Sequence, residues 1–158
     1  MVNLHRTENL LTLQEFKITG LFGELEHTIS FPMSQANEPE ILILVGRNGI
    51  GKTTILNLLS GLLTLNFVPF MRVPFRYCQL RLSNGDCLFV ESQRQPKSLL
   101  IGFNELRAII TIEPRDSERV VEKIEIIELI RQTAAPVLNR IHFELVNIHR
   151  LIADMQTP

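Results

Sequence analysis

A glycine-rich turn between two apolar segments constrains this chain more than any other feature. The turn reads Gly46-Arg47-Asn48-Gly49-Ile50-Gly51-Lys52-Thr53. Before it, Ile41 to Val45 is continuously aliphatic and largely branched, as is typical of a parallel strand covered on both faces. After it, Thr53 to Leu63 repeats apolar residues at helical spacing. A strand, a tight turn and a helix in this order indicate an α/β fold with a mixed sheet, its parallel part around Ile41 to Val45.

The turn matches the pattern of a phosphate-binding loop: a glycine, four residues, then Gly-Lys-Thr. Backbone N–H groups that wrap a phosphate need positive φ angles and close approach, which glycine allows at the lowest steric cost. The free N–H groups and the dipole at the start of the following helix favour the same anion. The predicted nucleotide-binding residues are Gly46, Arg47, Asn48, Gly49, Ile50, Gly51, Lys52, Thr53 and Thr54.

Three side chains of this segment have separate predicted roles. Lys52 is the catalytic candidate, because its mobile charge can reach the β and γ phosphates. The Thr53 hydroxyl is the predicted metal contact for Mg²⁺, with waters and phosphate oxygens as the other ligands, and Thr54 is placed to contact the α phosphate. A guanine-specific protein would normally carry an Asn-Lys-x-Asp stretch further along, and this chain has none. ATP with Mg²⁺ is therefore the predicted ligand.

Composition limits the classes of protein that could carry this loop. The chain has 158 residues, 45% of them hydrophobic and 21% charged, which fits one globular domain and excludes a disordered or fibrous chain. Sixteen basic and seventeen acidic residues give a net charge of −1, which excludes a strongly basic nucleic-acid coat. Two cysteines, no signal pattern and no apolar run near 18 residues predict a cytoplasmic protein with no membrane segment.

The segment before the loop favours antiparallel strands. Phe16 to Thr19 and Leu25 to Phe31 alternate apolar and polar residues, and the loop Gly20 to Gly23 separates them. Leu106 to Ile112, much later in the chain, is a further candidate strand.

A hairpin is predicted after the helix that follows the loop. Asn84-Gly85, a strong two-residue turn signal, lies between the apolar stretches Phe75 to Leu82 and Cys87 to Val90. A two-residue turn would pair Leu80 with Phe89, Leu82 with Cys87 and Cys78 with Glu91.

The end of the chain is predicted to be helical. Asp116 or Ser117 can cap a helix that runs to about Gln132, although the isoleucine-rich stretch Lys123 to Ile130 keeps a strand open as the alternative. Pro136 suits the first turn of a final helix. The apolar residues of that helix form a heptad seam, which favours a core-facing helix or the root of an arm that binds a partner. The seam is Leu138, Ile141, Leu145, Ile148, Ile152 and Met155.

The finer pattern Gly-x-Asn-Gly-x-Gly-Lys-Thr-Thr, from Gly46 to Thr54, resembles the ATP-binding cassette (ABC) class. With the two strands before it and the hairpin after it, residues 15–92 resemble the opening of the RecF, SMC and OLD-like ATPases. The resemblance implies a P-loop NTPase fold in which two heads, as a homodimer or as two ATPase halves, close around ATP. Members of this group use that closure to move or clamp DNA in repair, chromosome maintenance or phage defence. The implied divisions are a flexible N-terminus at 1–14, an ATPase lobe at 15–113 and a helical segment at 114–158.

The same resemblance implies where the base of the nucleotide lies. The loop from Leu21 to Glu24 would lie near it, and Phe22 is a candidate contact, with a role in the core as the alternative for this phenylalanine.

Two parts of that family's site have no clear counterpart in this sequence. The Leu-Ser-Gly-Gly signature, which contacts ATP across the dimer, is matched only by Leu59-Ser60-Gly61, in the helix after the loop. An apolar strand ending in Asp-Glu is absent. Glu91 and Glu144 are the remaining candidates for the acid, and Gln93 or Gln95 for a glutamine that contacts magnesium, with ordinary polar surface roles as the alternative. The chain therefore resembles the N-terminal lobe of a longer ATPase, an incomplete head that needs a second half for hydrolysis.

Two other functions remain open. One is a small phosphotransferase acting on nucleotides or metabolites, although about 45 residues precede the loop and no arginine-rich lid stands out. The other is a non-catalytic interaction module whose heptad helix docks to a partner.

A basic stretch at 70–97 is a candidate for contact with DNA phosphates, where binding would depend on salt. Five basic residues there against Asp86 and Glu91 give a net charge of +3, and a solvated strand face is the alternative. The basic residues are Arg72, Arg76, Arg81, Arg94 and Lys97.

Overall fold

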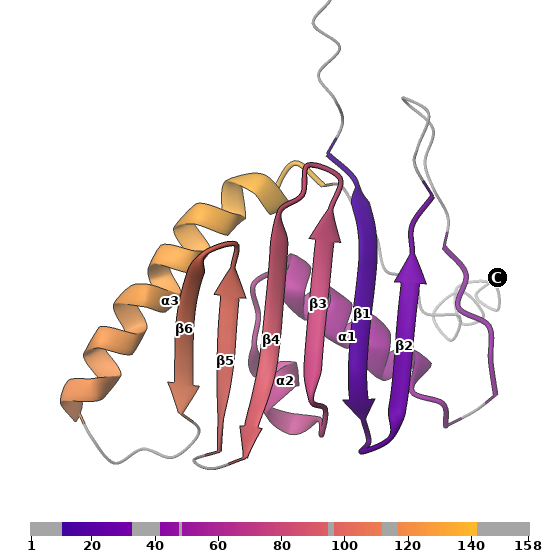
Figure 1. Cartoon of the computed structure of the whole chain (residues 1–158), viewed down its shortest axis with the longest axis horizontal. Coiled ribbons are helices and arrows are strands. Elements are labelled where there is room, and N and C mark those ends of the chain that lie inside the picture. The colour runs from indigo at the N-terminus through magenta and orange to yellow at the C-terminus, as the bar shows by residue number, and fades with distance from the viewer. Residues whose placement is uncertain (1–10, 33–41, 48, 95–96, 112–116, 142–158) are drawn as a thin grey trace, which may run out of the picture.

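Six strands form one antiparallel sheet in the computed structural model, which describes residues 11–32, 42–47, 49–94, 97–111 and 117–141 (Figure 1). All neighbouring strands in the order β2-β1-β3-β4-β5-β6 run antiparallel. The N-terminal hairpin and the later meander thus share one sheet, because β3 pairs directly with β1. The strands are β1 (Leu13–Leu21), β2 (Leu25–Ser30), β3 (Tyr77–Leu82), β4 (Cys87–Arg94), β5 (Lys97–Phe103) and β6 (Leu106–Thr111).

The helices cover one face of this sheet, as Figure 1 shows. Buried apolar side chains fill the space between the layers, among them Phe16 and Ile18 of β1 and Leu62 of the first helix. Such a two-layer arrangement buries the apolar face of an antiparallel sheet and leaves the other face polar. On β1 and β2 the exposed face carries Lys17, Glu26, Thr28 and Ser30. The helices are α1 (Lys52–Leu63), α2 (Val68–Arg72) and α3 (Ser117–Leu138).

The predicted parallel strand over Ile41 to Val45 is wrong for the residues that the structure describes, 42–45. They form no strand, and Ile43 and Val45 are 70% and 89% exposed, while Leu44 packs against the core. A parallel strand needs neighbours that take up its backbone hydrogen bonds and cover both its faces. The described sheet offers no such neighbour, because all its strand pairs are antiparallel. The predicted mixed sheet is therefore corrected to an antiparallel one.

The β3–β4 hairpin is confirmed, but its predicted register is wrong by one residue. Cys78 faces the helices, where burial raises the pKa of its thiol and keeps it a neutral packing group. Cys87 is half-buried, and both cysteines are free. The observed pairs are Cys78–Val90, Gln79–Phe89, Leu80–Leu88 and Arg81–Cys87.

The turn of this hairpin explains the shift. The Leu82 N–H donates to the Asp86 carbonyl at 2.9 Å, so three residues rather than two form the connection. The last of the three, Gly85, has a φ of 91°, which is the left-handed conformation that three-residue turns require at this position.

β5 was not predicted from the sequence, because its consecutive apolar residues do not alternate. Leu99 and Ile101 are buried toward the helices, and Leu100 is half-buried on the other face. Gly102 in the same strand lies directly under the Phe89 ring of β4, where a Cβ atom would collide with the ring. A strand with apolar residues on both faces therefore hides the alternation on which strand prediction depends.

The helical prediction for the later part of the chain is confirmed, and the strand alternative over Lys123 to Ile130 is wrong. α3 continues to Leu138 and contains Pro136, so Pro136 does not begin a new helix. Ala134 and Leu138, on either side of the proline, are both buried against the core, which holds this part of α3 in place. Asp116 and most of the heptad seam, from residue 142 onward, lie outside the described residues.

We expect Leu62→Ala to lower the free energy of unfolding by about 2–5 kcal/mol, because this α1 side chain is fully buried against the sheet. Leu129→Ala on α3, where the side chain is 47% exposed, is the matched control and should lower it by less than about 1 kcal/mol. Urea unfolding followed by circular dichroism measures both values. Equal losses for the two variants would contradict the packing of α1 on the sheet.

Candidate nucleotide-binding site

The loop of residues 46–51 joins the exposed segment 42–45 to α1 and has a backbone that glycine permits. Gly49 and Gly51 have φ angles of 85° and 91°, both in the left-handed region. Gly51 is the N-cap of α1, and its carbonyl accepts the Ile55 N–H at 2.8 Å. The helix predicted from Thr53 is thus confirmed and starts at Lys52. Asn48 lies outside the described residues, so its role stays a prediction.

The ammonium group of Lys52 binds the carbonyl groups of this loop. Its Nζ donates to the Gly46 carbonyl at 2.6 Å and to the Arg47 carbonyl at 2.8 Å. These two bonds hold the positive charge over the loop at the N-terminal end of α1. An ammonium group has three N–H donors, so one donor is left for a ligand after these two bonds.

The N-terminus of α1 is open to an anion. No side chain caps it, and its first turn contains no acidic residue. The first N–H groups of a helix have no partner within the helix, and they carry the positive end of its dipole. The amides of Lys52, Thr53 and Thr54 therefore favour a negatively charged group at this position.

The turn between β1 and β2 packs against the loop. A Cβ atom on Gly51 would lie 3.0 Å from Leu21 Cδ2 and 3.2 Å from Phe22 Cε2. Phe22 has a φ of 53° and is 48% exposed, and its N–H donates to the Pro74 carbonyl at 2.9 Å. The structure thus brings Phe22 to the loop, while its contact with a base stays a prediction. No local pattern signals the contacts with Gly51 and Pro74, because these residues lie far apart in the sequence.

The described part of the chain offers few side chains that could bind magnesium. No group of three or more histidine, cysteine or acidic side chains among the described residues could hold a metal ion. Thr53, the predicted metal contact, is exposed at the start of α1. Mg²⁺ keeps several waters and binds readily through substrate phosphates. The arrangement therefore fits a magnesium ion that arrives with a nucleotide and contacts the Thr53 hydroxyl.

The structure does not bring the candidate acid and glutamine to the loop. Glu91 follows the buried Val90 on β4, so its side chain lies on the face of the sheet opposite α1. Gln93, in the same strand, accepts a hydrogen bond from the Ser98 hydroxyl at 3.0 Å. Gln95 and Glu144 lie outside the described residues.

The signature-like fragment Leu59-Ser60-Gly61 is part of the packing of α1. Leu59 and Gly61 are buried in α1. A Cβ atom on Gly61 would lie 2.8 Å from the Asn66 carbonyl oxygen and 2.9 Å from Phe70 Cε2. The glycine therefore allows the turn into α2 to approach α1 closely.

The family model described as "ABC transporter" matches residues 29–70. The match starts in β2 and ends in α2, so it includes the whole loop and α1. No curated protein matches the chain. Within the described ranges, the helices are too short or too polar to cross a lipid bilayer. The match supports an ABC-type P-loop domain that binds ATP.

We expect Gly51→Ala to melt at a lower temperature than Gly49→Ala. Both changes force a side chain onto a left-handed backbone, but only the methyl group at residue 51 would meet neighbours, since nothing lies within 4 Å of a Cβ on Gly49. Thermal unfolding followed by circular dichroism compares them. Adding Phe22→Ala to both should narrow the difference, because it removes one of the neighbours. Identical melting temperatures for the single variants would contradict the packing of the β1–β2 turn on the loop.

Proposed function

We propose that this chain is the ATP-binding lobe of an ABC-class ATPase of the RecF, SMC and OLD-like type, that it needs a second half for hydrolysis, and that it acts on DNA. The observation that carries the nucleotide proposal is the donor-rich cradle at residues 46–54. The Lys52 ammonium group and the uncapped start of α1 present positive charge and N–H donors, and Gly49 and Gly51 have the left-handed backbone that such a loop needs. A polyphosphate is the ligand that such a cradle favours.

Different residues of the cradle contact different parts of ATP in this proposal. The loop and the first amides of α1 surround the phosphates, and Lys52 neutralises charge on the β and γ groups. The Thr53 hydroxyl contacts Mg²⁺, Thr54 contacts the α phosphate, and Phe22 lies beside the base. Positioning and electrostatic stabilisation dominate phosphoryl transfer, so Lys52 contributes by its charge.

The need for a second half is supported by two features of the fold. The aliphatic residues Ile43 and Val45 lie exposed just before the loop, where burial would stabilise them. In addition, the candidate acid Glu91 lies across the sheet from the cradle. A partner ATPase half or a second copy of the chain would supply neighbouring strands for segment 42–45 and the missing acid.

The action on DNA is supported by the resemblance and, in part, by the positions of the basic residues. The Arg76 N–H donates to the Thr19 carbonyl, and Phe22 binds Pro74, so the connection from α2 to β3 adjoins the β1–β2 turn. Arg72 and Arg76 flank this connection near the loop. Arg81 lies on the open face of the sheet and belongs to a different surface. Phosphate contacts by Arg72 and Arg76 would weaken as salt increases.

Lys52→Ala should weaken ATP binding by about 10- to 100-fold, as expected when a hydrogen-bonded charge is lost. Isothermal titration calorimetry with ATP and Mg²⁺ measures the affinity. Lys17→Ala removes an exposed lysine from the open face of β1 and is the matched control, with unchanged affinity expected. Wild-type affinity in Lys52→Ala would contradict the site.

The chain alone should release no more phosphate from ATP than Lys52→Ala does, because the candidate acid Glu91 lies across the sheet from the cradle. Phosphate release with Mg²⁺ measures this, with the two proteins at equal concentration. Turnover by the chain alone that disappears in Lys52→Ala would contradict the need for a second half. Transfer of phosphate to a small molecule would favour a phosphotransferase instead.

A further inference from the structure

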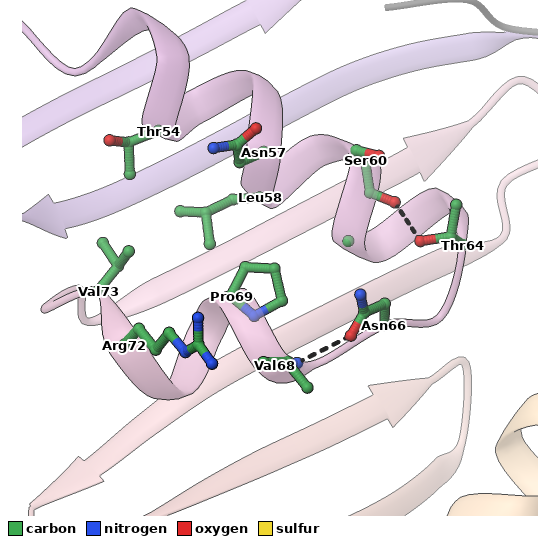
Figure 2. A pocket seen from close by; sticks show the side chains of 11 residues that line it. Thr54, Asn57, Leu58, Ser60, Thr64, Asn66, Val68, Pro69, Arg72 and Val73 are labelled. Carbon is green, nitrogen blue, oxygen red and sulfur yellow. Dashed lines mark hydrogen bonds between the residues drawn. The ribbon is translucent and has the colours of Figure 1, made fainter.

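A groove runs along the side of α1, between this helix and α2 (Figure 2). It extends from Thr54 on α1 to Thr64, just beyond the end of this helix, and is bounded on the other side by Pro69, Arg72 and Val73. Its volume of about 390 Å³ lies within the range of small-ligand sites, roughly 300–1,000 Å³. The turn from α1 to α2 closes one end, where the Thr64 hydroxyl donates to the Ser60 carbonyl at 2.7 Å.

The polar groups that line this groove are neutral or positive. None of the lining residues is acidic. The side chains of Arg72 and Asn57 make no hydrogen bond or ion pair with any other residue that the structure describes. The Asn66 Oδ1 accepts the Val68 N–H at 3.1 Å, so its amide donors remain for a ligand. Exposed N–H donors of Asn57, Arg72 and Asn66 thus line the groove from α1, from α2 and from the turn between them.

The rest of the lining is apolar. Val68, Pro69 and Val73 contribute hydrocarbon surface beside the polar groups (Figure 2). A ligand that fills this groove therefore gains from a compact apolar body as well as from hydrogen bonds.

We propose that the groove binds a small molecule in which an oxyanion is attached to a compact apolar group. The planar guanidinium of Arg72 can hold two oxygens of a carboxylate or a phosphate at once. The amides of Asn57 and Asn66 can donate to the oxyanion or to a second polar atom of the ligand, and Pro69 and Val73 contact the apolar part. The groove and the cradle share Thr54. The groups that would hold the oxyanion, Arg72, Asn57 and Asn66, lie outside residues 46–54, so this proposal does not depend on the proposed nucleotide site.

Nuclear magnetic resonance on the full ¹⁵N-labelled chain tests the groove with chosen probes. Phenyl phosphate, benzoate, inorganic phosphate and benzyl alcohol are titrated while the side-chain amide of Asn66 is observed. We expect saturable shifts with phenyl phosphate or benzoate and none with neutral benzyl alcohol. Whichever of the two aromatic anions binds with the higher affinity identifies the oxyanion as phosphate or carboxylate. Inorganic phosphate should bind more weakly than phenyl phosphate, because it lacks the apolar body.

Variants separate this site from the cradle. Arg72→Gln should weaken binding of the preferred probe at least tenfold, and Asn57→Leu should also weaken it. Arg140→Gln, which changes an exposed arginine just beyond α3, and Lys52→Ala should leave it unchanged. The proposal is overturned if neither aromatic anion gives a saturable shift. It is also overturned if Arg72→Gln and Asn57→Leu bind as the wild type does, or if Lys52→Ala alone abolishes the shifts, which would assign the anion to the nucleotide loop.

Discussion

The close approach of Gly51 to the β1–β2 turn is the contact on which the rest of the site depends. Leu21 is fully buried beneath the turn, and Phe22 lies so close to the glycine that a Cβ atom there would be only 3.2 Å from the ring. The hydrogen bond from Phe22 to Pro74 attaches the same turn to the chain that leaves α2. The β1–β2 turn, the glycine loop and the connection from α2 to β3 thus meet where α1 begins. The positive end of the helix dipole therefore lies near the end of β1.

The two sides of the loop differ in how completely they are packed. On one side, α1 buries Leu58 and Leu62 against a sheet whose strands all pair antiparallel. On the other side, segment 42–45 exposes aliphatic side chains and has no strand partner in the described chain. Exposed aliphatic surface of this kind can mark a contact with another protein surface. This asymmetry supports the interpretation that the structure is one lobe of a larger ATPase.

One helix serves two kinds of anion chemistry in these proposals. At its start, backbone N–H groups and Lys52 suit a polyphosphate, because the positive end of the helix dipole and the lysine charge lie together. Along its side, Arg72 and two amides adjoin apolar surface, which suits a single oxyanion on a larger body. The opposite side of α1 packs in the core.

Local patterns were sufficient for the parts of the structure that depend on neighbours in sequence. The alternation of β1 and β2, the helical spacing of α1 and the glycines at 49 and 51 each describe a local backbone geometry, and the structure has these elements. The predictions that failed involve partners or turns. Ile41 to Val45 has the composition of a buried strand but lacks the neighbours that would make it one. The observed β3–β4 register differs from the predicted one by one residue, because Gly85 closes a three-residue turn.

The sequence by itself determined that a glycine loop with a lysine precedes an uncapped helix, since this depends only on residues next to one another. Only the tertiary structure decided that Phe22 covers Gly51, that Glu91 lies across the sheet from the loop, and that Arg72 lines a groove beside Asn57. Each of these follows from which strands pair and how two helices pack. Such contacts join residues that are distant along the chain, and no local spacing encodes them.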